Sequence, residues 1–99
     1  MNFFKSKADI NEGVKRFRDS RNALLVDVRS EDEYRDGHIR GSVNIPLDKL
    51  REVKLSKNNY LFVYCHSGMR SSRAVKWFND NGYRAESIGG IVDYKGHIE

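Results

Sequence analysis

The sequence predicts an α/β domain built on a parallel sheet. Apolar, strand-like runs alternate with helix-like segments along the chain, and residues 24–28 (LLVDV) form a continuous apolar run typical of a strand buried on both faces. The chain has 99 residues, with 38% hydrophobic and 32% charged side chains, which is the composition of a folded protein rather than a disordered one. We therefore expect a single domain over residues 1–99.

The first half of the chain is expected to alternate helix and strand. Asp9 and Glu12 have the spacing of a capping box, and the apolar residues after them recur with helical period, which predicts a helix over residues 10–18. Residues 24–28 form the first strand. A short helical turn over residues 31–34 is expected to end near Gly37.

The second half continues this alternation. The proline at position 46 keeps its predecessor out of the helical region, and the aromatic and β-branched run 60–64 is the clearest strand of the chain. The expected elements are an extended segment at residues 43–46, a short helix at 47–53, the strand 60–64, a helix that follows residue 70 and ends at Gly82, and a strand at 83–88 that stops at Gly89 and Gly90.

Cys65 is the only cysteine, which excludes an internal disulfide and any metal site made of several thiolates. A lone cysteine is either a small core residue or a reagent. Cys65 directly follows the strand 60–64 and precedes a loop that leads into a helix. Ligands of open α/β sheets bind at this end of the strands, so we interpret Cys65 as a reagent.

The loop after Cys65 reads Cys-His-Ser-Gly-Met-Arg-Ser. Gly68 allows the backbone to curl so that successive amides point inward, and the helix that follows adds its positive N-terminal end. These dipoles, with Arg70 and His66 nearby, are expected to favour the thiolate and lower the pKa of Cys65. The loop thus predicts a nucleophile and an anion site in one segment.

The other polar residues suggest structural roles. Ser71 and Ser72 are adequately explained as helix caps, although a substrate contact remains open for both. His66 has no acidic partner in the sequence, so we expect a surface residue rather than a general base. Asp27 ends a buried strand and must be hydrogen-bonded there, which predicts that it holds neighbouring loop amides. No histidine has the spacing of a metal ligand, and we expect no metal.

The charge distribution excludes several function classes. The net charge of +4 is modest, and its lysines and arginines are spread along the chain without an aromatic-interleaved basic run, so we expect no nucleic-acid partner. No stretch approaches about 18 apolar residues, and residues 1–6 lack an apolar leader, which predicts no membrane association. We expect a cytoplasmic protein in a reducing compartment.

Three separated motifs together resemble a single-domain rhodanese, from about residue 3 to the C-terminus. They are the loop at Cys65, the residues 26–29 (VDVR) with the stretch 33–47 (EYRDGHIRGSVNIPL), and the late Gly89-Gly90 pair. One departure is Tyr94, near where family members often carry tryptophan; we expect a conservative packing change. The resemblance implies a three-layer α/β/α fold around a central, mainly parallel sheet of five strands.

The resemblance also implies a sulfurtransferase. In family terms, Cys65 takes a sulfane sulfur from thiosulfate or a persulfide donor and passes it, as a Cys65 persulfide, to a thiol, cyanide or another thiophilic acceptor, including a protein. The implied substrate-binding residues are His66, Ser67, Gly68, Met69, Arg70 and Ser71. The reaction needs neither a metal nor an organic cofactor, and we expect a monomer.

Two alternatives remain beside this interpretation. Related phosphatases and arsenate reductases have a cysteine loop one residue longer, with the arginine six positions after the cysteine; here Arg70 is five positions after Cys65, which argues against both. The second alternative is a non-catalytic carrier that accepts sulfur from a partner and hands it on. Carrier and enzyme share the same loop, so the sequence does not separate them.

Overall fold

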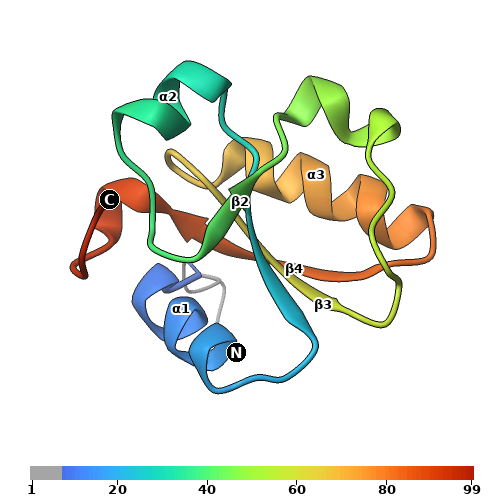
Figure 1. The fold of residues 1–99 in the computed structure, drawn as a ribbon, viewed down its shortest axis with the longest axis horizontal. Coiled ribbons are helices and arrows are strands. Elements are labelled where there is room, and N and C mark those ends of the chain that lie inside the picture. Colours follow the sequence, from blue (N-terminus) through green and yellow to red (C-terminus); the bar gives the residue numbers. More distant parts are fainter. Residues whose placement is uncertain (1–7) are drawn as a thin grey trace, which may run out of the picture.

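The computed structural model describes residues 8–99, so the expectations for residues 1–6 lie outside the described residues. The chain alternates helices and strands as expected (Figure 1). The elements are α1 (Ile10–Arg18), β1 (Ala23–Asp27), α2 (Glu31–Asp36), β2 (Ser42–Asn44), the 3-10 helix η1 (Leu47–Glu52), β3 (Tyr60–Cys65), α3 (Met69–Asp80), β4 (Arg84–Gly90) and the 3-10 helix η2 (Ile91–Asp93).

The strands form one parallel sheet in the order β2-β1-β3-β4. The parallel arrangement is confirmed, but the sheet has four strands in the described part of the chain, whereas the resemblance implied five. Residues 8–99 contain four strand-like runs, and the segments between them are helices, 3-10 turns and loops. A further pairing there is the isolated antiparallel bridge between Ile39 and Ile98, which is too short to make a strand.

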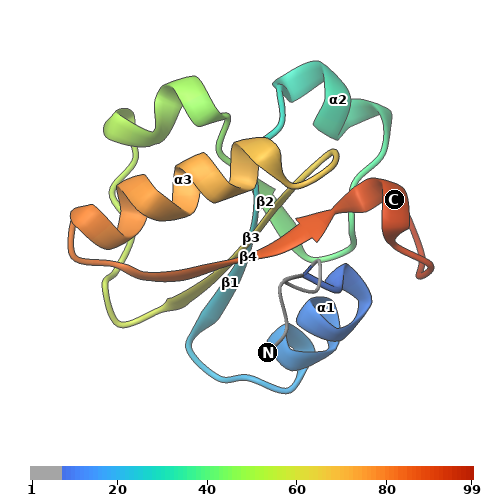
Figure 2. The same ribbon diagram turned by 180° about the vertical axis from the view of Figure 1, so that it is seen from behind.

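Helices cover both faces of the sheet, which confirms the three-layer α/β/α arrangement. Helix α1 packs on one face, and α3 with η1 packs on the other (Figures 1 and 2). The core under α3 and η1 consists of Val26, Val28, Ile45, Leu50, Leu61, Val63, Cys65, Ala74 and Phe78. The core under α1 consists of Ile10, Val14, Leu25, Ile39, Phe62, Tyr64 and Ile88. Successive residues of β3 alternate between these two cores, because strand side chains point to opposite faces.

Local capping differs from the prediction at one helix. Asp9 does cap α1, but its carboxylate accepts from the amide of Asn11 at 2.9 Å rather than from residue 12. A full capping box is found in α2 instead, where Ser30 and Glu33 bond each other's backbone amides. Glu33 is thereby fixed at the start of α2, where it contacts Arg70 just after residues 66–68, the loop that follows Cys65 and is called the active loop below.

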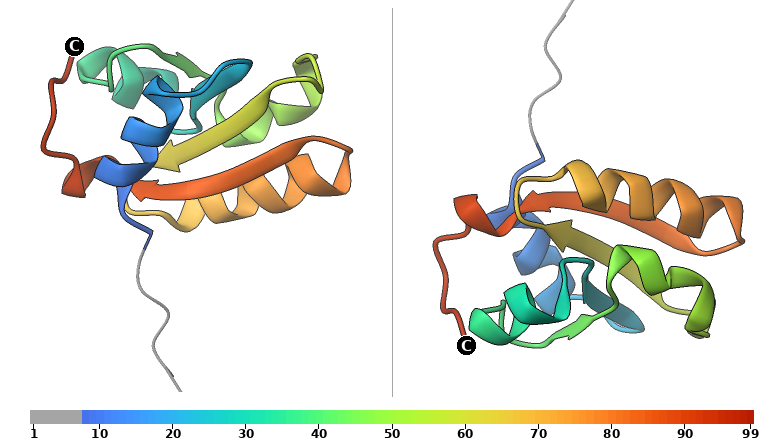
Figure 3. Two further views of the ribbon diagram at one scale, coloured as in Figure 1. Left: turned by 90° about the horizontal axis from the view of Figure 1, so that it is seen from below. Right: turned by 90° about the horizontal axis from the view of Figure 1, so that it is seen from above.

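The strand β4 extends further than expected. Gly89 and Gly90 were predicted to stop it, but they pair with Tyr64 and Cys65 after a register shift next to Val63. The prediction was wrong because the glycines let β4 continue past the loop rather than turn away from it. Helix α3 lies alongside β4, so the C-terminal part of β4 and the N-terminus of α3 are neighbours (Figure 3).

Candidate active site

The sulfur of Cys65 lies at the carboxyl end of β3, an inner strand of the sheet. Residues 66–68 form the loop to α3, and Gly68 adopts a left-handed conformation (φ 110°) that turns the backbone into the helix. The side chain of Cys65 is enclosed, with 1% of the residue exposed. The placement at a strand end before a turn and a helix is as the sequence predicts.

The sulfur of Cys65 acts as the hydrogen-bond acceptor that caps the N-terminus of α3. Gly68, the N-cap residue, has no side chain to satisfy the free amides of the first turn. The sulfur of Cys65 accepts instead, from the amide of Gly68 at 3.0 Å and from the amide of Ser71 at 3.3 Å. The Ser71 hydroxyl oxygen lies 3.5 Å from the same sulfur. The loop therefore forms a cradle of hydrogen-bond donors around a single sulfur atom.

This cradle changes the ionisation of the thiol. Burial alone raises the pKa of Cys65, because it disfavours the charged thiolate. The hydrogen bonds from the Ser71 hydroxyl and amide, and from the amides of Gly68 and Ser67, act in the opposite direction and outweigh it. The pKa of Cys65 consequently lies below its ordinary value, which makes the thiolate, the nucleophilic form, more available.

The side chain of Arg70 is held by Glu33 of α2. Its two terminal nitrogens donate to the two carboxylate oxygens at 2.6 and 3.0 Å, a bidentate pair between the start of α3 and the start of α2. The hydrogen bond from Arg70 lowers the pKa of Glu33 to about 2. In turn Glu33, and more weakly the charge of Cys65, raise the pKa of Arg70. The arginine thus contributes a positive field at the loop while its position is fixed by Glu33.

A buried ion pair supports the neighbouring strand end. Asp27 is fully buried, and it accepts from the Arg29 amide at 2.8 Å and from the Arg29 guanidinium at 2.7 to 3.0 Å. Arg29 also donates to the Gly37 carbonyl at the end of α2. Asp27 therefore does bind a loop amide, as predicted, and its main partner is the guanidinium. The pair fixes the segment that carries Glu33.

The paired glycines allow close contact between β4 and the active loop. A Cβ atom on Gly90 would collide with the carbonyl oxygen of His66 and with Cα of Ser67, and one on Gly89 would lie 2.9 Å from the Ala8 carbonyl oxygen. This close backbone approach requires the absence of a side chain at both positions. It means that residues at the end of β4 form one side of the site.

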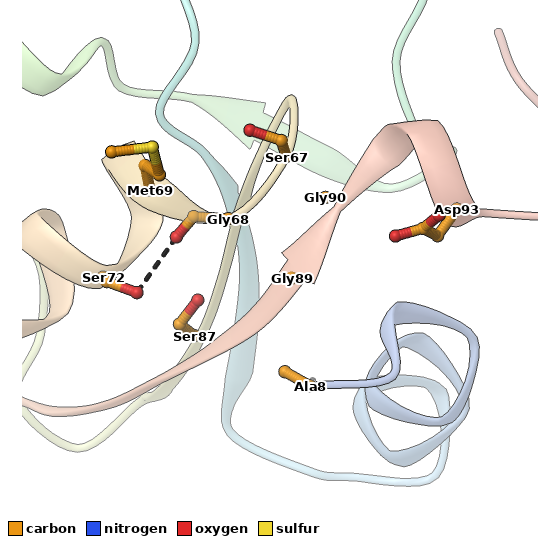
Figure 4. A pocket seen from close by; sticks show the side chains of 9 residues that line it. All are labelled: Ala8, Ser67, Gly68, Met69, Ser72, Ser87, Gly89, Gly90 and Asp93. Carbon is orange, nitrogen blue, oxygen red and sulfur yellow. Dashed lines mark hydrogen bonds between the residues drawn. The ribbon is translucent and has the colours of Figure 1, made fainter. Parts of the chain in front are cut away.

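A pocket of about 400 Å³ opens between the loop and the end of β4 (Figure 4). Its wall consists of Ser67, Gly68, Met69 and Ser72 from the loop and α3, Ser87, Gly89 and Gly90 from β4, and Ala8 and Asp93. Three of the predicted site residues, Ser67, Gly68 and Met69, line this pocket. The predicted site did not include Ala8, Ser72, Ser87, Gly89, Gly90 and Asp93, although a substrate contact was left open for Ser72. A signal for Ser87 was present, since it is a polar residue two positions before the glycine pair.

The predicted loop residues have different surroundings. The sulfur of Cys65 is surrounded by the amides of Ser67, Gly68 and Ser71 and by the Ser71 hydroxyl. The His66 side chain is exposed, as expected, and its carbonyl accepts from the Val92 amide at 3.2 Å. The side chain of Met69 is exposed at the pocket wall, so it is open to a ligand rather than packed in the core.

Within residues 8–99, no three histidine, cysteine, aspartate or glutamate side chains are grouped so that they could hold a metal ion. In the same range, none of the helices has the length and apolar character needed to cross a membrane.

The chain resembles several known proteins. It is 32% identical over 101 residues to a tRNA uridine(34) hydroxylase of Buchnera aphidicola, covering 92% of this chain and 31% of that protein. It is 32% identical over 100 residues to "Putative sulfur carrier protein YrkF" of Bacillus subtilis, covering 97% of this chain and 49% of that protein. The chain therefore spans less than half the length of these two relatives.

A solved structure and a family model agree with this likeness. The fold matches a rhodanese-like domain protein from Staphylococcus aureus with a TM-score of 0.81 and 25% identity, over 96% of this chain and 97% of that one. The model of the rhodanese-like domain matches residues 11–98. On this evidence, and with the cysteine loop in the expected place, the chain belongs to the rhodanese-like domain family.

Proposed function

We infer that this protein transfers sulfane sulfur through a persulfide on Cys65. The observation that carries the proposal is the donor cradle: the amides of Gly68 and Ser71 donate to one enclosed sulfur, the Ser71 hydroxyl oxygen lies 3.5 Å from it, and the pKa of Cys65 is lowered. Such a cradle stabilises a thiolate, and equally the anionic outer sulfur of a persulfide. A cysteine that served only as a core residue would need none of these donors.

The proposed reaction has two steps, written here with thiosulfate as donor. The Cys65 thiolate attacks the outer sulfur of thiosulfate, a sulfur–sulfur bond forms to Cys65, and the donor's sulfur–sulfur bond breaks so that sulfite leaves with the electron pair. A thiolate or cyanide then attacks the terminal sulfur of the persulfide. Cys65 leaves as the thiolate, and the acceptor becomes a persulfide or thiocyanate. No electrons enter from outside, and the two half-reactions give ping-pong kinetics.

The loop residues have distinct proposed roles in this reaction. The amides of Ser67, Gly68 and Ser71 hold the reacting sulfur, and Arg70 adds a positive field that favours the anionic donor. Met69 contributes a side chain to the pocket wall, and His66 contributes its backbone to the loop. Because the chain contains no second cysteine, the sulfur on Cys65 must be discharged to an external acceptor.

A sulfur carrier is the second candidate, and one relative favours it. The Bacillus subtilis relative is named as a putative sulfur carrier, and the match covers nearly all of this chain. A carrier would load Cys65 in the same way but pass its sulfur only to a specific protein. The two functions therefore differ in the discharge step and not in the cradle.

The test measures thiocyanate formation from thiosulfate and cyanide by the wild type and by Cys65→Ser. We expect turnover by the wild type, parallel double-reciprocal plots for the two substrates, and no turnover by the variant. Turnover that survives Cys65→Ser would overturn the proposal. A Cys65 persulfide that forms, resists cyanide and small thiols, and is discharged only by a protein would establish the carrier instead.

A further inference from the structure

Two serines occupy positions that face the core next to Cys65. On α3 the buried residues are Ser71, Ala74 and Phe78, and Ser71 has no exposed surface. On β4, Ser87 pairs with Val63, whose side chain belongs to the core under α3. A buried hydroxyl such as that of Ser71 is costly unless it is hydrogen-bonded, and the hydroxyl oxygen of the half-buried Ser87 lies 2.7 Å from it. Apolar packing alone does not explain why two hydrogen-bonded hydroxyls lie beside Cys65.

The pair connects the enclosed sulfur with the pocket. The Ser71 hydroxyl oxygen is 3.5 Å from the sulfur of Cys65 and 2.7 Å from the Ser87 hydroxyl oxygen. Ser87 lines the pocket, where its hydroxyl is directed toward the loop at Gly68 (Figure 4). Cys65 itself does not line this pocket and is 1% exposed. The two hydroxyls therefore provide a continuous polar path from the sulfur to the pocket.

The Ser71 hydroxyl has a choice of acceptors. It has one proton, and the carbonyl of Gly68, at 3.0 Å, is an alternative acceptor to the sulfur. That carbonyl keeps other partners if Ser71 turns away, because the amide and the hydroxyl of Ser72 donate to it at 3.2 and 2.9 Å. Ser71 can therefore donate to the thiolate without leaving a buried carbonyl unsatisfied.

We propose that Ser87 is a positioning residue for the Cys65 thiolate. Its hydroxyl donates to the Ser71 oxygen, so that the single Ser71 proton turns to the sulfur when the thiol ionises. A hydroxyl that accepts one hydrogen bond is a stronger donor in the next, so Ser87 strengthens the contact made by Ser71. The proposal rests on the proposed function only in assigning the thiolate as the working form of Cys65.

The same pair accounts for the path of the proton. As the thiol ionises, its proton passes to the Ser71 oxygen, the Ser71 proton passes to the Ser87 oxygen, and the Ser87 proton passes to water in the pocket. Each hydroxyl receives one proton and releases one, and no electrons move. The end state has Ser87 donating to Ser71 and Ser71 donating to the thiolate, which is the arrangement that stabilises the charge.

The test is the pH dependence of alkylation by iodoacetamide, a neutral reagent, followed by intact mass. The chain's single cysteine makes the mass change specific to Cys65. For Ser87→Ala we expect the midpoint to move to higher pH and the rate below the midpoint to fall about two- to tenfold, the effect of one lost hydrogen bond. The plateau rate at high pH is unchanged. Ser87→Thr, which keeps the hydroxyl, restores the wild-type midpoint.

Ser20→Ala is the control. It also removes one hydrogen-bonded serine hydroxyl, but that hydroxyl, beyond the end of α1, donates to the Arg16 carbonyl and contacts neither the sulfur, Ser71 nor the Gly68 carbonyl, so we expect the wild-type midpoint. An unshifted midpoint in Ser87→Ala, or an equal loss of rate at every pH, would overturn the proposal. Alkylation needs no sulfur donor. The result is therefore readable even if Cys65 forms no persulfide, which separates failure of this inference from failure of the proposed function.

Discussion

The pair between Glu33 and Arg70 gives a prediction with opposite effects on stability and on chemistry. Glu33→Gln keeps the size of the side chain and its capping role but removes the charge that Arg70 binds at 2.6 and 3.0 Å. The hydrogen bond from Arg70 lowers the pKa of Glu33 from 4.5 to about 2, which corresponds to roughly 3 kcal/mol without screening. The two side chains are 34% and 36% exposed, so solvent screening reduces the expected loss to about 1 kcal/mol.

The chemical effect has the other sign, because Glu33 neutralises the charge that Arg70 directs at the loop. In Glu33→Gln we expect a lower pH midpoint for Cys65 alkylation and a lower KM for thiosulfate. In Arg70→Ala the field is lost, and we expect a higher midpoint. Thiosulfate turnover in this variant should fall by about an order of magnitude or more, since a charge-assisted hydrogen bond contributes roughly 1.5 to 3 kcal/mol.

The free energy of unfolding of each variant is measured by urea denaturation, followed through the fluorescence of Trp77, the single tryptophan. A double-mutant cycle of Glu33→Gln and Arg70→Ala isolates the pair. Asp32→Asn is the matched control on α2, because it breaks a more exposed ion pair with Arg35 and should cost under about 0.5 kcal/mol. Additive effects in the cycle would refute the stability argument. If Glu33→Gln formed the Cys65 persulfide more slowly, as Arg70→Ala is expected to do, the pair would act by fixing the position of Arg70 and not through its charge.

Three further predictions follow from the same structure. The stabilisation by Glu33 is present above the unfolded pKa of 4.5 and is lost as the pH falls toward 2, so the stability difference between wild type and Glu33→Gln should vanish over that range in acid titration; a constant difference would contradict it. Asp27→Asn leaves Arg29 with an unpaired buried charge and should cost about 3 to 5 kcal/mol in urea unfolding, and a loss below about 1 kcal/mol would argue against the pair. Gly90→Ala places a methyl group against the backbone of the active loop, so persulfide loading should fall at least about tenfold while circular dichroism keeps the helix signal; normal loading would refute the close approach.

Much of the fold could be predicted from local patterns in the sequence. The apolar run near Leu25 and the aromatic run before Cys65 are strands because their side chains fill both cores, and both features are visible in single segments. The extension of β4 through Gly90 was missed, because glycine more often interrupts a strand. Here the missing side chains let β4 pass the active loop, a tertiary effect that no local pattern contains.

The nucleophile and its loop could be predicted from the sequence, but the residues that hold Arg70 and Ser71 in place could not. Cys65 and the loop amides follow from one contiguous segment with a glycine. The partner of Arg70, by contrast, is 37 residues away in the chain, and the partner of Ser71 is 16 residues away. Such contacts depend on how α2 and β4 are placed around the loop. Spacing within the sequence therefore identified the nucleophile and missed the residues that position it.

The most direct test of the central claim is the intact mass of the protein after incubation with thiosulfate. We expect the wild type to gain the mass of one sulfur atom, to lose it on addition of cyanide, and to gain nothing from sulfate; Cys65→Ser should gain nothing from either anion. Absence of any added sulfur after treatment with thiosulfate, a thiol persulfide and polysulfide would contradict the account.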